Sequence, residues 1–232
     1  MNLWITLFVI AVTIFSYWFS RRLNRRNPTS PLTNVVFLST TIIILILLAS
    51  GLTFEDYTPG KNIMTFLLGP ATVALAVPLH KNVQILKRYL VPILSGILLG
   101  VLSTLISVAA LAKLLGLDQV ITLSMLPKSV TVPIAVEITR IVGGDPALTA
   151  AFVVATGTGG SMIAFWLLDR LKIQNPICRG LAIGTTAHGQ GTAIAIQEGE
   201  LPGAMAGIAM ALTAVFTSFL APFLIPFLLI IF

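Results

Sequence analysis

The run Ile177–Gln197, ICRGLAIGTTAHGQGTAIAIQ, contains the stretch that decides the fold. Its length is close to the roughly 20 residues that carry a helix across a bilayer. Its centre, Gly184–Thr192, nevertheless holds glycines, threonines, a histidine and an amide. A helix that opens in lipid leaves main-chain N–H groups without partners, at a cost of several kcal/mol each. We therefore expect this stretch inside a membrane protein, where protein or a water-filled cavity surrounds it.

Apolar runs of similar length occupy most of the remaining chain. They are Leu3–Ser20, Leu32–Leu52, Asn62–Leu79, Tyr89–Leu115, Ala147–Leu168 and Gly203–Phe232. Of the 232 residues 56% are hydrophobic and 9% charged, with a mean hydropathy of +1.00, whereas soluble domains are roughly 25% charged. We therefore expect an all-α polytopic membrane protein rather than a soluble enzyme. The single cysteine, Cys178, excludes an intrachain disulfide.

One more run, Val120–Val142, is long enough to cross a membrane but contains Lys128, Glu137 and two prolines. If this run dips in and returns, the basic clusters Arg21–Arg26, Lys81–Arg88 and Arg170–Arg179 all lie on one side, as the positive-inside rule favours. This arrangement predicts about seven transmembrane helices plus one re-entrant or broken element. The N-terminus is then outside and the C-terminus cytoplasmic. The net charge of +6 thus arises from loops, with no basic face that indicates nucleic acid.

The predicted topology divides one membrane domain, residues 1–232, into four parts. They are an N-terminal anchor helix with a basic loop (1–31), a first repeat (32–115), a broken or re-entrant element (116–146) and a second repeat (147–232). The two repeats run in opposite senses and form a possible inverted 3+3 repeat. The middle run of each is interrupted by glycine, at GPATV (69–73) and GQGTA (189–193). Discontinuous helices in corresponding positions of two inverted halves indicate a transporter's binding site.

Polar residues at these interruptions are the candidate binding residues for a small anion. They are Thr72, Lys128, Ser129, Thr131, His188, Gly189, Gly191 and Thr192. Lys128 supplies positive charge, the hydroxyls supply hydrogen bonds, and the glycines allow close approach of the main chain. Glu137 and His188 are candidates for carrying a coupling proton, because each is an ionisable group inside an apolar run.

Simpler structural roles remain open for several of these residues. Glu137 can pair with Arg140 three positions later on a helix, and His188 can be a hydrogen-bonded packing residue. Asp145 is expected to cap the helix that starts at Pro146. No catalytic motif, cofactor site or metal-ligand cluster is expected, since the only other histidine is His80.

Three segments resemble the LrgB/CidB family of antiholin-like proteins or autolysis modulators. They are LGPATVALAVPL (68–79), LPKSVTVPIAVEITRIVGGDPALTAAFVVATG (126–157) and GLAIGTTAHGQGTAIAIQEGELPGAMAGIAMAL (180–212). Among the candidate residues, Lys128, Ser129, Glu137 and His188 lie at positions of the family's motifs, as do Pro133, Gly189, Gly191 and Thr192. Some members carry a basic residue where this chain has Ile194. Substrate preference is therefore expected to differ.

The resemblance implies a multi-pass protein of the bacterial inner membrane. Because the family includes the LrgB-like half of the plastid glycolate/glycerate transporter, the first hypothesis is a secondary transporter of glycolate, glycerate, lactate or pyruvate. The alternative is a holin- or antiholin-like regulator of murein hydrolase activity and cell lysis, acting with an LrgA/CidA-type partner. A homo-oligomer is compatible with either function.

Overall fold

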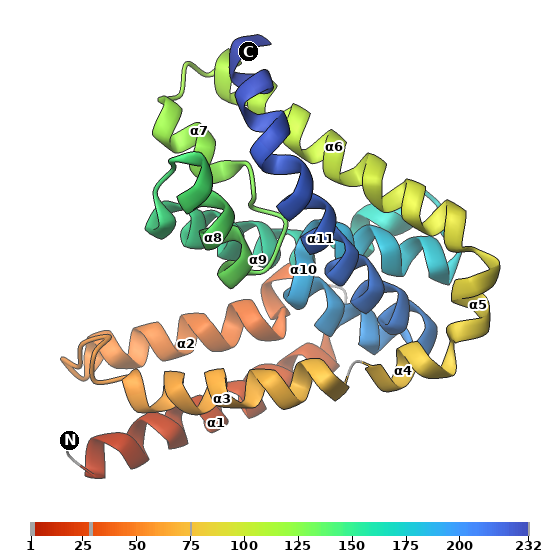
Figure 1. Ribbon diagram of the computed structural model, residues 1–232. Coiled ribbons are helices and arrows are strands. Elements are labelled where there is room, and N and C mark those ends of the chain that lie inside the picture. Colours follow the sequence, from red (N-terminus) through yellow and green to blue (C-terminus); the bar gives the residue numbers. More distant parts are fainter. Residues whose placement is uncertain (1–2, 28–29, 75, 232) are drawn as a thin grey trace. The chain divides into compact units, whose positions relative to one another are not determined.

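The computed structural model describes residues 3–27, 30–74 and 76–231 (Figure 1). Within these residues all regular structure is helical and no strand occurs. In the same part of the chain four helices are long and apolar enough to cross a membrane. They are α1 (Leu3–Arg26), α6 (Leu90–Leu114), α9 (Pro146–Arg170) and α11 (Glu200–Ile231). The prediction of an all-α polytopic membrane protein is confirmed.

The chain forms two compact units, Met1–Ala76 and Val77–Phe232. The boundary lies inside the predicted first repeat, 32–115. The prediction of one membrane domain with repeats at 32–115 and 147–232 stays a prediction. The interrupted segments 126–144 and 184–192 both lie in the second unit.

The first unit contains α1, a short 3-10 turn η1 (Pro31–Thr33), α2 (Val35–Ala49) and α3 (Thr58–Ala74). The Asn34 side chain accepts hydrogen bonds from the Val36 and Phe37 amides and so begins α2. The sequence predicts that the helix opens at GPATV (69–73), but α3 continues through Pro70 and ends at Ala74. A proline can bend a helix without ending it when the preceding turns remain hydrogen-bonded.

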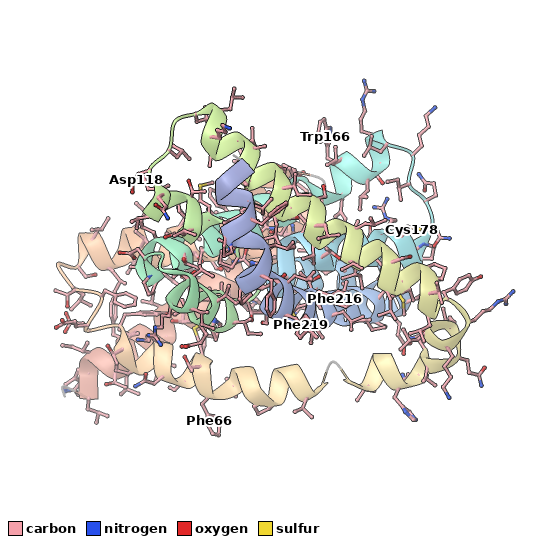
Figure 2. All side chains as sticks on the ribbon, turned by 45° about the horizontal axis from the view of Figure 1, so that its top comes forward. Phe66, Asp118, Trp166, Cys178, Phe216 and Phe219 are labelled. Carbon is pink, nitrogen blue, oxygen red and sulfur yellow. The ribbon has the colours of Figure 1, made fainter. Side chains whose placement is uncertain are left out.

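In the second unit, short helices α4 (Ala76–Lys81) and α5 (Val83–Arg88) lead into α6. Helices α6 and α11 run alongside each other in the same direction (Figure 1). Their facing sides form one apolar core, in which Ile97, Leu105 and Ile225 are almost completely buried. Large apolar side chains such as Trp166 on α9 and Phe219 on α11 point outward instead (Figure 2). This inside-and-outside apolar pattern is that of a helix bundle dissolved in lipid.

Between α6 and α9 the chain forms a first hairpin, from α7 (Gln119–Met125) through a turn at 126–131 to α8 (Val132–Val142). Neither helix spans a bilayer, since at about 1.5 Å per residue they are roughly 10 and 16 Å long. The hairpin is joined to the start of α9 through Ser124, in the last turn of α7, because Asp145 N donates to Ser124 Oγ (2.8 Å). We call this contact with α9 the base of the first hairpin. The hydroxyls of Thr139 and Thr149 also bond there (2.8 Å). Val120–Val142 therefore enters the unit and returns to the same end.

The structure differs from the sequence prediction at Ile177–Gln197, which we expected to cross the membrane. This run lies in α10 (Pro176–Glu198), which is broken at His188. Arg179 Nε contacts Glu198 Oε2 at 2.9 Å, although these residues would be about 28 Å apart along a straight helix. The Arg179 guanidinium also bonds Asp169 of α9 (2.7 Å). The run therefore folds back on itself as a second hairpin.

The two hairpins enter the second unit from opposite ends of α9. The first has its base at residues 145–149, and the second has its base at Asp169 and Ile173. Figure 2 shows Asp118 and Cys178, which lie at the beginnings of the two hairpins, at opposite ends of this unit. The predicted cytoplasmic C-terminus depended on residues 177–197 crossing the membrane, and the fold-back removes that basis.

Candidate functional site

The tip of the second hairpin is His188, whose backbone takes φ 41° and ψ −126°. This positive φ reverses the chain within one residue and is strained for any residue with a side chain. The ring is buried, and its Nε2 lies 3.1 Å from the Val153 carbonyl oxygen of α9. That contact holds the tip against the middle of α9.

Small residues make this tight reversal possible. A Cβ on Gly157 of α9 would lie 2.7 Å from His188 Nε2, so the glycine leaves room for the ring. A Cβ on Gly191 would lie 2.6 Å from the Ile183 carbonyl oxygen on the other arm of the hairpin. The sequence analysis explained the small size of Gly191 by the approach of a ligand. The structure gives it a packing reason. Gly189 is different, because a Cβ there would meet only Met210 Sδ, at 3.9 Å.

Polar side chains after the tip are tied to neighbouring groups. Thr158 of α9 donates to Gln190 Oε1 (2.9 Å), and the buried Thr192 hydroxyl donates to the His188 carbonyl oxygen (2.9 Å). Sequence reasoning missed the α9 partners Val153, Gly157 and Thr158. The only signal for them was the small-residue stretch TGTGGS at 156–161, which is common in helices that pack closely in membranes.

The tip of the first hairpin is the turn 126–131, LPKSVT. Surface loops are normally exposed, yet Leu126 and Val130 are each 1% exposed and Ser129 is 6% exposed. Lys128 is half-buried, and its Nζ donates to Ser129 Oγ over 3.4 Å. Thr131 is the N-cap residue of α8 but makes no side-chain capping hydrogen bond. The tip is therefore a buried polar turn.

Residues of both hairpins line one small cavity, together with α6 and α11. Its volume is about 10 Å³, which is about the space one water-sized species needs. The lining residues are Val101, Thr104, Leu105, Leu126, Ser129, Thr185, Thr213 and Thr217. Thr213 Oγ1 is fully buried and has no hydrogen-bond partner. Of this set the sequence analysis identified only Ser129, because single threonines in apolar helices carry no motif.

Helix ends place partial charges of both signs at the two tips. Two helices begin here, α8 at Val132 and the second half of α10 after His188, and helix N-termini carry positive partial charge. Two helices also end here, α7 at Met125 and the first half of α10 before His188, and these ends carry negative partial charge. The unit thus offers separate main-chain partners for an anionic group and for a cationic one.

The structure does not bring every predicted site residue to the tips. Glu137 is exposed on α8 and forms an ion pair with Arg140 (2.6 Å). Burial, which was the reason for expecting a proton carrier there, is therefore absent at Glu137. Thr72 lies on α3 in the first unit, and its side chain is outside the described residues. Asp145 caps α9 as predicted, accepting from the Ala147 and Leu148 amides.

Within the described residues there is no group of three or more His, Cys, Asp and Glu side chains that could hold a metal ion. The site is instead made of hydroxyls, one imidazole, one amide and one ammonium. Such a set can bind and release a small polar molecule. The fold and the site define a polytopic helical membrane protein with two opposed hairpins.

Comparison with known proteins agrees with the resemblance in the motifs. Residues 13–227 match the model of the LrgB-like family, and the chain belongs to that family. The chain is 36% identical to the uncharacterized protein YxaC of Bacillus subtilis, over 90% of this chain and 91% of that protein. It is 36% identical to the antiholin-like protein LrgB of Bacillus cereus, over 88% and 89% of the two chains. No solved structure matches.

Proposed function

We propose that this protein transports small monocarboxylates of the glycolate, glycerate, lactate and pyruvate class across the bacterial inner membrane. One observation carries the proposal: two hairpins are tied to opposite ends of α9, and each has its break inside the second unit. Discontinuous helices near the membrane midplane are where secondary transporters bind their substrates. A site between opposed hairpins can be opened toward either side by moving one hairpin at a time.

The chemistry of the tips suits a carboxylate. The N-termini of α8 and of the second half of α10 favour negative charge, and Lys128 adds a full positive charge beside the first of them. Thr131 leaves the α8 N-terminus without a side-chain cap, so main-chain N–H groups there can receive an anion. The carboxylate is thus assigned to Lys128 and the start of α8, with the Gln190 side-chain NH₂ on the opposite hairpin as a further donor, because Gln190 Oε1 already accepts from Thr158. His188 remains a candidate proton carrier, because its side chain is buried.

The names of relatives favour a second function. Several relatives in Bacillus cereus strains are named antiholin-like protein LrgB, and that name fits a regulator of murein hydrolase activity and cell lysis better than a transporter. Under this function the chain acts with an LrgA/CidA-type partner or with further copies of itself. The unit's exposed apolar helices give such a partner a surface in the membrane.

One vesicle experiment separates the two functions. Purified protein is reconstituted into liposomes that contain a trapped dye, and uptake of labelled lactate, glycolate and pyruvate is measured. Transport predicts saturable uptake that unlabelled acid suppresses, without dye release. Unselective dye release, or uptake no faster than in empty liposomes, contradicts transport and leaves the antiholin-like function.

The carboxylate assignment is tested with matched lysine variants. Lys128→Ala should raise the acid concentration for half-maximal uptake about tenfold or more, since a charge at membrane depth is poorly screened. Lys113→Ala, at the exposed end of α6, should leave it unchanged. Equal behaviour of the two variants would remove Lys128 from the site.

A further inference from the structure

The hydroxyl-lined cavity contains a polar atom that the protein itself does not satisfy. Thr213 Oγ1 has no hydrogen-bond partner, and Thr213 is 1% exposed. Leaving a buried hydroxyl unsatisfied costs about 1–3 kcal/mol. An occupant that contacts this oxygen would remove the cost, so the cavity is suited to a bound species.

The lining limits what that species can be. Its side chains offer five hydroxyl oxygens, from Thr104, Ser129, Thr185, Thr213 and Thr217, and no nitrogen. Thr104 already donates its proton to the Gly100 carbonyl oxygen (2.9 Å), so its lone pairs are free to face an electron-poor partner. Hard metal cations prefer oxygen ligands of this kind. A volume of about 10 Å³ has no room for a carboxylate group.

The helix ends favour positive charge in the same place. Leu126 lies at the end of α7, and Thr185 lies in the last turn before the break in α10, so both belong to helix ends with negative partial charge. Ends of broken helices and their free carbonyls coordinate coupling cations in transporters. No carboxylate lines the cavity, and the Lys128 ammonium, 3.4 Å from Ser129 Oγ, repels a divalent ion twice as strongly as a monovalent one.

We propose that this cavity binds one dehydrated monovalent cation of sodium size, held by Ser129, Thr185, Thr213 and Thr217 with Thr104. The ion joins both hairpins to α6 and α11, because its ligands come from all four elements. Binding the ion therefore favours the arrangement in which these four elements are close together. Resting on the proposed transport function, the ion is the coupling partner of the acid, whose carboxylate binds at the opposite, N-terminal helix ends.

The site can be tested without measuring transport. A ligand that binds only the folded protein raises its unfolding temperature. The Tm of the detergent-purified protein is measured as NaCl replaces choline chloride at constant ionic strength, and again with KCl. We expect a saturable rise in Tm with Na⁺ and a smaller rise with K⁺, because the larger ion keeps its oxygen ligands farther from its charge. No rise with Na⁺, or equal rises with both ions, would overturn the proposal in favour of a bound water.

Paired threonine variants locate the ion. Thr213→Val keeps the shape of the side chain and removes an unsatisfied hydroxyl, so this variant should be at least as stable as the wild type in choline chloride. It should need about tenfold more Na⁺, or more, for half of the Tm rise. Thr185→Val should behave in the same way, whereas Thr186→Val, at the exposed neighbour, should match the wild type. An unchanged Na⁺ response in Thr213→Val would overturn the assignment.

Coupling is then tested in liposomes that carry an imposed Na⁺ gradient. The wild type should accumulate labelled acid when Na⁺ is higher outside, and Thr213→Val should lose this dependence while still exchanging labelled for unlabelled acid. Acid uptake that ignores the Na⁺ gradient overturns the coupling role. If uptake fails under every condition while the Na⁺-dependent Tm rise persists, the proposed transport function is wrong and the ion site stands.

Discussion

The two hairpins bring a polar turn into the middle of an apolar unit by different means. The first has a wide tip, the turn 126–131, with Pro127 just after the end of α7 and Pro133 in the first turn of α8. The second reverses at the single residue His188, so its two arms lie in direct contact. A wide tip exposes main-chain groups toward the interior, whereas a tight tip needs small residues such as Gly191 along its arms. The first tip is therefore suited to binding, and the second to precise placement.

The bases of the hairpins differ as well. The first base is held by neutral hydroxyls, with Ser124 accepting from the Asp145 amide and Thr149 donating to the Ser124 carbonyl oxygen. The second base is held by charge, because Arg179 bonds Glu198, Asp169 and the Ile173 carbonyl oxygen together. Neutral hydrogen bonds are individually weaker than charge-assisted ones. We therefore expect the first hairpin to open more easily than the second.

The largest expected effect concerns the side of the membrane that each hairpin base faces. In a Cys178→Ser background, single cysteines are placed at Gln174, Gln197 and Leu115, all of them exposed. An impermeant thiol reagent should reach residues 174 and 197 from the same side, since the second hairpin returns to where it began. It should reach residue 115 from the opposite side. Labelling of 174 and 197 from opposite sides would restore a full crossing.

The next effect tests the charged base. The side chain of Arg179 is 10% exposed and that of Glu198 is 20% exposed. Arg179→Ala leaves the Glu198 charge buried without its partner, which should lower the free energy of unfolding by about 3 kcal/mol. Chemical unfolding in mixed detergent micelles measures this loss, with the exposed Arg170→Ala as the control. Because apolar pairs can replace buried ion pairs, Arg179→Met with Glu198→Leu should recover much of it. No recovery would show that the charges have another role.

A smaller effect distinguishes packing from ligand approach at the second tip. Gly191→Ala forces a Cβ to within 2.6 Å of the Ile183 carbonyl oxygen and should separate the arms, at about 1–3 kcal/mol. Gly189→Ala meets nothing closer than 3.9 Å and should fold normally. If Gly189→Ala nevertheless blocks acid uptake, its open side belongs to the substrate. Equal stability of the two variants would argue against direct contact between the arms.

The smallest effect tests the neutral base. Ser124→Ala removes the acceptor of the Asp145 amide and should cost about 1 kcal/mol in the same unfolding measurement. The exposed Ser218→Ala on α11 is the matched control. If Ser124→Ala costs as much as Arg179→Ala, the two bases are equally strong. The contrast between the hairpins would then not hold.

Much of the candidate site could be predicted from the residues, but its assembly could not. Lys128, Ser129, His188 and Thr192 were identifiable because polar groups and glycines are conspicuous inside apolar runs. The α9 partners of His188 were missed, since Val153 and Gly157 look like ordinary residues of a membrane helix. Thr213 was missed for the same reason. Glu137 was selected for its charge, yet it lies on the exposed side of α8, which periodicity over so short a helix does not reveal.

The sequence by itself determined that this is a membrane protein, that it is all-α, and where its helices are interrupted. These follow from local chemistry: apolar runs of membrane length, and glycine, proline and polar groups within them. Only the tertiary structure decided that Ile177–Gln197 turns back instead of crossing. A straight helix and a hairpin have nearly the same local hydrogen bonds, and they differ by a single residue. The choice is made by distant partners, namely Arg179 with Glu198 and His188 with Val153.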